Sequence, residues 1–277
     1  MNKMPSPKAP SVYIGHGTPL NVIWDTNYKK NLKNFAQSIP LPHSVLVMSA
    51  HWEKNIPLQI TSGFQPQIIY DYYGFPEEMY QLQYNSLGNP TLAKQIADRL
   101  NSRGLETHLN EVQGFDHGAW IPMKIMFPEA NIPLLQISIP IPRKSKSLFK
   151  IGQLLAEFRK EGVMLLGSGN LVHNLPYVFQ QVRKGKLGIS NWIHTPEEKW
   201  AVETDRWIKE KINDNNIEDL LESSIKAPHF NRAAPTTEHF DPLYFVIGTL
   251  DQQEGIAYIH EGFEAGSISM RSFTVES

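Results

Sequence analysis

Three of the ten histidines in this sequence come at or shortly after the ends of apolar runs that have the character of β-strands. His16 follows the run SVYIG, His51 follows SVLVMSA, and His173 lies a few residues after GVMLLG. In open α/β sheets, ligands bind in the crevice outside the carboxyl ends of the strands. Three strands of one sheet would therefore present these histidines to the same edge. His239, with Glu238 beside it, would join them from the first turn of a late helix.

Histidines gathered in this way are suited to binding a metal ion. Neutral imidazole is the commonest metal ligand, and three protein ligands leave coordination positions open for a substrate. The sequence has no cysteine, which excludes disulfides, thiolate ligands and a cysteine nucleophile. Any metal would have to be held by imidazole, carboxylate or water. Each histidine also has an ordinary interpretation, as a loop, capping or helix-end residue. The spacing alone does not decide between this interpretation and metal binding.

The other histidines offer weaker candidates. His117 lies in the segment GFDHGAW, either as a turn residue before a helix or as a donor in a substrate pocket. His229 lies in an irregular stretch shortly before His239, and its role is undefined. We interpret the remaining histidines, which lack a strand-end context, as surface or strand residues: His43, His108, His194 and His260.

Several common catalytic motifs are missing from the sequence. The triplet around Ser168 lacks the third glycine of a dinucleotide-binding fingerprint, and nothing resembles a P-loop. Ser168 also does not stand in the G-x-S-x-G elbow of a serine hydrolase. The aromatic-rich residues 63–88 are expected to form an ordered excursion. Its rings would either pack in the ordinary way or form the wall of a pocket for an aromatic substrate.

The candidate residues need strands and helices to position them. Continuous apolar runs at residues 11–15, 44–50, 132–139 and 162–167 predict strands buried on both faces. Helical spacing predicts helices at residues 91–100, 120–127, 147–160 and 196–212, and Thr236 or Thr237 would cap another over residues 239–250. Residues 267–275 alternate like a strand, whereas residues 182–191 and 228–235 have no regular pattern. The alternation predicts a layered α/β fold, with one domain over residues 1–277.

The composition limits the class of partner. Hydrophobic residues make up 41% and charged residues 19% of the chain, and the net charge is −2. This balance gives no electrostatic basis for binding nucleic acid or an anionic membrane, so a small or neutral substrate fits better. Residues 1–10 are polar and proline-rich, unlike a signal peptide, and no apolar run approaches the length of a membrane span. We therefore expect a soluble, cytoplasmic protein.

A set of short motifs, taken in order and spacing, points to a known family. They are GHGTP, SAHW, YDYYGFP, GFDHGAW, FPEANIPLLQIS, GSGNLVHNL, PTTEHFDPL and GSISMRSF. Together they cover nearly the whole chain, which resembles the class III extradiol ring-cleaving dioxygenases, most closely the branch named for 4,5-DOPA dioxygenase. The resemblance implies a three-layer α/β/α domain with a mixed, mostly parallel central sheet.

The resemblance also implies roles for individual residues. The metal ligands would be His16, His51 and a residue of TTEHF, which is His239 in the DOPA-dioxygenase-like branch. Glu238 is the alternative, because relatives of the protocatechuate type use a glutamate. His173 matches the family's acid–base histidine, which also approaches the metal in a resting state. His117 matches a pocket histidine that contacts substrate or dioxygen.

The reaction implied is the opening of a catechol such as DOPA beside its two hydroxyls, with both atoms of dioxygen inserted. The cofactor would be a divalent metal, Fe(II) for this chemistry, although three imidazoles also suit Zn(II). The segment after His173 differs from that of the plant enzymes that make betalain pigments, so pigment synthesis is not expected. The rival hypotheses are a zinc hydrolase and a metal-binding protein without turnover. No oligomeric state is predicted.

Overall fold

An eight-stranded β-sheet runs through the centre of the molecule. The computed structural model describes residues 8–251 and 254–276, and the polar segment noted at residues 1–10 lies mostly outside them. The strands follow the order β4-β3-β5-β2-β6-β1-β10-β7. Their bounds are β1 Ser11–Gly15, β2 Ser44–Asn55, β3 Leu58–Thr61, β4 Thr107–Asn110, β5 Leu134–Ile141, β6 Val163–Gly169, β7 Gly255–His260 and β10 Ser272–Glu276.

Strand direction decides where the ends of these strands meet. The four central strands β5, β2, β6 and β1 are parallel, and β4 is parallel to β3. β3 pairs antiparallel with β5, and β10 pairs antiparallel with β1 and with β7. The sheet is therefore mixed and mostly parallel, as predicted. The carboxyl ends of β1, β2 and β6 point to one edge of the sheet, and the candidate histidines lie near that edge.

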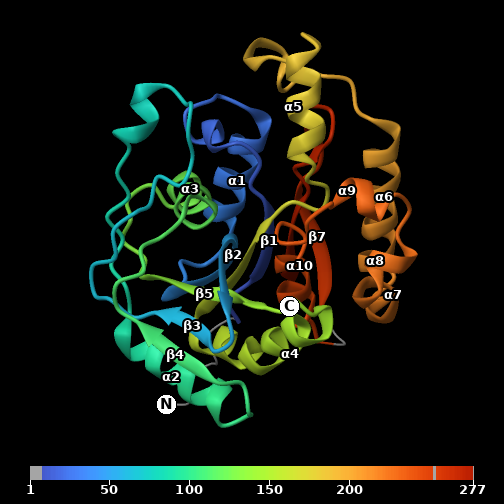
Figure 1. The fold of residues 1–277 in the computed structure, drawn as a ribbon. Coiled ribbons are helices and arrows are strands. Elements are labelled where there is room, and N and C mark those ends of the chain that lie inside the picture. The colour runs from blue at the N-terminus through green and yellow to red at the C-terminus, as the bar shows by residue number, and fades with distance from the viewer. Residues whose placement is uncertain (1–7, 252–253, 277) are drawn as a thin grey trace.

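Alternate residues of the central strands point into two separate hydrophobic cores. In β2, Val45 and Val47 belong to one core, and Leu46 and Met48 belong to the other. The first core packs against α1 (Asn27–Ser38) and α3 (His117–Met126). The second packs against α2 (Pro90–Asn101), α4 (Ser145–Leu155) and α10 (Pro242–Ile247). Helices thus cover both faces, and the predicted three-layer α/β/α arrangement is confirmed (Figure 1).

The remaining helices lie between β6 and α10 in sequence. They are α5 (Leu175–Arg183), α6 (Lys199–Asn213), α7 (Ile217–Leu221), α8 (Ser223–Lys226) and α9 (Phe230–Ala233). Figure 1 shows α6 to α9 gathered at one side of the sheet, with α5 above them. Short 3-10 turns are η1 Pro19–Val22, η2 Glu77–Tyr80, η3 Ala156–Glu161 and η4 Ile189–Asn191, and β8 Phe263–Glu264 pairs with β9 Ile268–Ser269. Within the described residues, every helix is too short or too polar to cross a membrane.

Most elements predicted from periodicity are present, with shifted ends. The predicted strands at 11–15, 132–139 and 162–167 correspond to β1, β5 and β6, and the helices at 91–100, 120–127 and 196–212 correspond to α2, α3 and α6. The helix expected over 147–160 is α4 followed by η3. The single strand expected over 267–275 is wrong: it divides into β9 and β10, because β9 pairs with β8 in a separate small sheet whereas β10 pairs with β1 and β7 in the central sheet.

Residues 63–88 form an ordered excursion that contains little regular structure. Its one helical turn is η2, and hydrogen bonds of both backbone and side chains hold the rest. The Tyr70 hydroxyl donates to the carbonyl of Leu82 at 2.5 Å, and the Tyr72 hydroxyl donates to the carbonyl of Met79 at 2.8 Å. The expectation of an ordered aromatic segment is therefore correct.

Candidate functional site

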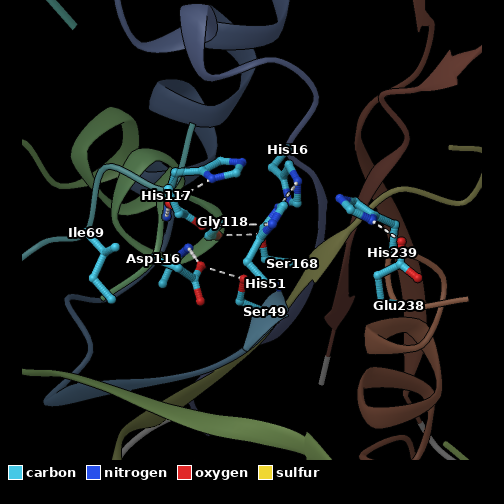
Figure 2. A network of polar contacts seen from close by, with 12 residues as sticks. His16, Ser49, His51, Ile69, Asp116, His117, Gly118, Ser168, Glu238 and His239 are labelled. Carbon is cyan, nitrogen blue, oxygen red and sulfur yellow. Dashed lines mark hydrogen bonds and ion pairs between the residues drawn. The ribbon is translucent and has the colours of Figure 1, made fainter. Parts of the chain in front are cut away.

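His16 lies directly after β1 and is buried. Its Nδ1 lies 3.0 Å from the Oγ of Ser168 in β6, and that hydroxyl donates its proton to the carbonyl of Gly118 at 2.5 Å. A hydroxyl has one proton to give, so Ser168 must accept from His16 Nδ1–H. This leaves a lone pair on Nε2 of His16. Figure 2 shows His16 beside Ser168 and His51, and the Nε2 atoms of His16 and His51 lie 3.3 Å apart.

His51 lies within β2, not after it as the sequence suggested. The strand continues to Asn55 because residues 53–55 pair with β5, and the register shifts between Met48 and Glu53. A shift of this kind re-aims a side chain in the bulged strand. The Nδ1 of His51 faces the Asp71 carboxylate at 3.9 Å, and its Nε2 lies 3.3 Å from Nε2 of His16.

His239 lies in a turn that precedes α10. The expectation that it begins the helix is wrong, because α10 starts at Pro242 and the amides of residues 240 and 241 bond to Thr237. Its carbonyl accepts from the amide of Asn170 at 2.8 Å, which fixes this turn to the end of β6. A Cβ at Gly169 would lie 2.0 Å from the same carbonyl, so only glycine permits this approach.

The side chain of His239 is oriented by its neighbour. Its Nδ1 lies 3.2 Å from Oε1 of Glu238, so the proton belongs on Nδ1 and the lone pair on Nε2. The other carboxylate oxygen of Glu238 accepts from Arg143 at 3.2 Å. Both carboxylate oxygens of Glu238 are thus engaged, one by Nδ1 of His239 and the other by Arg143, which favours His239 over Glu238 as a ligand.

These three histidines fit a divalent metal. Each can place one ring nitrogen within 4.8 Å of the other two. Two nitrogens that each lie about 2.1 Å from one tetrahedral ion are separated by about 3.4 Å, close to the 3.3 Å between the Nε2 atoms of His16 and His51. Burial lowers the pKa of His16, His51 and His239 well below its usual value, which keeps their lone pairs free.

His173 lies beside the cluster, just before α5. Its ring stacks on that of His239, with centroids 3.5 Å apart and planes inclined by 12°. Its amide donates to the carbonyl of Ala233 at 2.8 Å, and Asn174 caps α5 immediately after it. Burial lowers the pKa of His173 to about 4, partly opposed by the charge of Glu238. The ring is therefore neutral at ordinary pH and able to accept a proton.

His117 is the first residue of α3 and completes the group. Its ring centroid lies 3.9 Å from that of His51. The preceding residue, Asp116, is buried and caps α3 by accepting from the amide of Ala119 at 3.1 Å; it also accepts from Ser49 Oγ at 2.6 Å (Figure 2). These bonds tie the start of α3 to β2, so His117 and His51 are positioned together.

The histidines open into one cavity of about 450 Å³. All five candidate histidines line it, together with aromatic and apolar side chains from residues 63–88 and from α5. The other histidines of the chain are elsewhere: His43, His108, His194 and His229 are exposed, and His260 is half-buried in β7. The interpretation of His43, His108, His194 and His260 as surface or strand residues fits their positions, and His229, whose role was left undefined, lies at the surface.

Two acidic residues at the site were not singled out from the sequence. The Asp71 carboxylate accepts from the amide of His117 at 2.9 Å and lies 3.0 Å from its Nδ1. Glu264 is buried and accepts from the amide of Thr18 at 3.0 Å and from Asn21 at 2.6 Å, which holds the loop after His16. A carboxylate among tyrosines was a usable signal for Asp71, whereas the context of Glu264 offered none.

Comparison with known proteins supplies the family. Residues 7–272 match the model for the catalytic LigB subunit of aromatic ring-opening dioxygenase. The chain is 33% identical to the 4,5-DOPA dioxygenase extradiol of Beta vulgaris over 269 residues, covering 96% of both proteins. It is also 33% identical to the protein of that name from Escherichia coli (strain K12) over 275 residues, covering 98% of this chain and 96% of the relative.

A solved structure has the same fold. The crystal structure of an uncharacterized protein from Escherichia coli K12 superposes with a TM-score of 0.78 at 30% sequence identity, covering 96% of this chain and 99% of that one. The family model spans most of the chain and the curated relatives match it along nearly their whole length. The expected resemblance is thereby confirmed, and ring opening is favoured over the hydrolase and non-catalytic alternatives. The chain belongs to the family of the catalytic LigB subunit of aromatic ring-opening dioxygenases.

Proposed function

We propose that this protein opens the ring of a catechol beside its hydroxyls, using a divalent metal held by His16, His51 and His239. The observation that supports this most directly is the set of three unprotonated ring nitrogens at one sheet edge, each able to lie within 4.8 Å of the others. The cavity of about 450 Å³ next to them is large enough for a substituted aromatic ring. The catalytic domain is proposed to span residues 1–277.

The donor set and the family together suggest the cofactor. When bound, Fe(II) would supply redox chemistry with dioxygen and stabilise the charge of a catecholate. The same three imidazoles would also hold Zn(II). The Asp71 carboxylate lies 3.9 Å from Nδ1 of His51, too far for a hydrogen bond, and contacts His117 instead. Ser168 orients His16, and Glu238 orients His239. Such partners set the tautomer and ring orientation of metal-bound histidines.

His173 is the proposed proton acceptor. Its ring is neutral, because burial lowers its pKa to about 4, and it lies against His239 at the cavity wall. It would take a phenolic proton from the incoming catechol and later return a proton to the opened ring. A histidine in this position is suited to both transfers, because its proton affinity responds to charge that develops nearby.

His117 is the proposed donor to substrate or dioxygen. Asp71 and Asp116 hold its backbone and ring, so it needs little rearrangement to form a hydrogen bond in the cavity. Tyr72 contacts its ring edge-on at a centroid distance of 5.8 Å and would bound the space for the aromatic ring. Preorganised groups of this kind reduce the cost of orienting a substrate.

The test is reconstitution of the purified protein with ferrous iron under anaerobic conditions, followed by oxygen uptake with catechol, 4-methylcatechol and DOPA. We expect one dioxygen consumed per ring and a yellow ring-opened product. A protein with confirmed iron occupancy that leaves every catechol in this panel intact would refute the proposal. Zinc-loaded protein serves as the control, since zinc has no redox chemistry and should support no oxygen uptake.

A further inference from the structure

The cavity changes in character from its buried end to its mouth. The buried end holds the imidazoles of His16, His239 and His117, whose exposed fractions are 3%, 6% and 7%. The mouth holds large apolar side chains that remain open to water, including Tyr73 at 88% and Phe179 at 55%. Exposed apolar side chains gathered around a cavity are typical of a surface that binds an apolar group.

The two sides of this mouth come from unrelated parts of the chain. Tyr73 belongs to the excursion at residues 63–88, whereas Leu175 and Phe179 lie one turn apart on α5. Trp192 adds a further ring from the segment after α5. Separate segments of the chain contribute apolar side chains to this rim. Incidental exposure therefore does not explain the whole rim.

Groups that could recognise a charged substituent are scarce in the cavity. Among the described residues, no lysine or arginine lines it, and Asp71 is the single carboxylate. Asp71 is already engaged with His117. Arg143, which contacts Glu238 outside the cavity, also pairs with Glu53 at 2.6 Å. A carboxylate on a bound ligand would find no cationic partner in the described lining.

We propose that this site selects catechols whose ring substituent is uncharged and apolar and discriminates against substituents that carry a carboxylate. The inference rests on the proposed ring-cleaving function. The two hydroxyls would face the histidines, and the substituent would extend toward Leu175, Phe179 and Trp192. A carboxylate held against these apolar side chains would lose part of its hydration without gaining a cationic partner, which is unfavourable. Each methylene fully buried there would instead raise affinity about fourfold. DOPA is thus expected to be a poor substrate for this chain.

The test uses three catechols of nearly equal size on the iron-loaded protein. Their substituents at position 4 are 3-methylbutyl, propanamide and propanoate, which are apolar, polar but neutral, and charged. We expect kcat/KM to fall in that order, with at least a tenfold difference between the first and the last. Equilibrium binding of the same compounds, measured without oxygen, should follow the same order. A propanoate that is bound and opened as well as the 3-methylbutyl compound would overturn the inference.

A variant pair tests whether the mouth is responsible. Phe179→Arg places a cation at the rim, and Gln180→Arg places the same charge on the same helix at a position that does not line the cavity. We expect Phe179→Arg to shift the propanoate-to-alkyl ratio of kcat/KM at least tenfold toward propanoate, and Gln180→Arg to leave it within twofold. Equal effects of the two variants would contradict the placement of the substituent.

Failure of the inference and failure of the proposed function give different results. If the protein binds these compounds in the expected order but opens none of them, the ring-cleaving function is wrong and the apolar selectivity stands. If it opens them with the charged compound preferred, the function stands and the selectivity is wrong. Should Phe179→Arg fail to fold, the substrate series on the unaltered protein still decides.

Discussion

The ring of His173 stacks on the ring of His239, with centroids 3.5 Å apart. This contact places the proposed proton acceptor against a proposed metal ligand without making it one of the three convergent nitrogens. His173→Ala is therefore expected to retain metal and lose turnover, with kcat lower by about 10²- to 10⁴-fold, the usual contribution of a general acid–base group. Metal content and oxygen uptake, measured on the same preparation, check this.

Exposed His194 provides the control for that variant, since His194→Ala should change neither quantity. Loss of all metal in His173→Ala would show instead that His173 is primarily a ligand.

Replacing His239 and Glu238 separately distinguishes the two candidates for the third ligand. His239→Ala is expected to abolish stable metal binding, because it removes one of three converging nitrogens. Glu238→Gln is expected to weaken metal binding only about 10- to 100-fold, the usual effect of altering a group that orients a ligand. Titration with zinc and a competing chelator measures both. The reverse order of effects would assign the ligand role to Glu238.

Ser168 tests the tautomer of His16. Without its hydroxyl, nothing in β6 fixes the proton on Nδ1 of His16, so Ser168→Ala should lower metal affinity about 10- to 100-fold. Ser62 is the matched control, because it is also buried and its hydroxyl has no hydrogen-bond partner within the described part of the chain. Ser62→Ala should bind metal like the unaltered protein, and an equal loss in both variants would count against the tautomer argument.

The buried pair of Arg271 and Asp205 is expected to matter for stability. The guanidinium Nε lies 3.1 Å from both oxygens of Asp205, and Ser269 donates to the same carboxylate at 2.6 Å. Arg271→Met would leave a buried carboxylate without its cation, at a cost of about 3–5 kcal/mol. Urea unfolding measures this. On α6, exposed Arg206→Met should change the free energy of unfolding by less than about 0.5 kcal/mol.

Glu264 gives a prediction about pH. Burial raises the pKa of Glu264 above its ordinary value, although hydrogen bonds from Thr18, Asn21 and Trp192 oppose the shift. The folded protein therefore keeps this proton to a higher pH than the unfolded chain. Its contribution to stability must fall as pH rises from the ordinary carboxyl range through the folded-state value.

The Glu264→Gln variant removes that titration. Relative to the unaltered protein, its free energy of unfolding should fall less between about pH 4.5 and pH 7. Exposed Glu77→Gln is the control and should reproduce the slope of the unaltered protein. If the free energy of unfolding of Glu264→Gln also depends on pH as that of the unaltered protein does, the Glu264 carboxyl titrates normally.

Much of the fold could be predicted because its central strands are buried on both faces. The runs at β1, β5 and β6 are mostly apolar, and a mostly apolar run can be recognised without tertiary information. Helix α1 was not predicted, because its sequence NYKKNLKNFAQS is largely polar and only Tyr28, Leu32 and Phe35 are buried. The extension of β2 past His51 depends on pairing with β5, which a local pattern cannot specify.

The residues of the candidate site also fall into those that the sequence predicts and those that it does not. The strand ends indicated His16, His51 and His173, and a predicted late helix indicated His239. The family motifs then assigned roles to these residues and to His117. Asp71 reaches the site from an irregular segment, and Glu264 reaches it from the far end of the sequence. Such contacts depend on how distant segments pack, so spacing could not place either carboxylate at the site, although the tyrosines around Asp71 were a usable signal. The ligand set itself stays a prediction until metal binding is measured.

The aromatic excursion at residues 63–88 has a consequence for how such an enzyme diversifies. Tyrosine hydroxyls bonded to nearby carbonyls shape it, as Tyr70 does with Leu82, whereas the sheet ladder aims the histidines. Apart from Asp71, the side chains of this excursion that line the cavity are thus held by contacts other than the sheet ladder that positions His16 and His51. Mutations can accumulate in this wall and change which substituents are accepted while the reaction is inherited unchanged. Related chains that share the histidines can accordingly differ in substrate specificity.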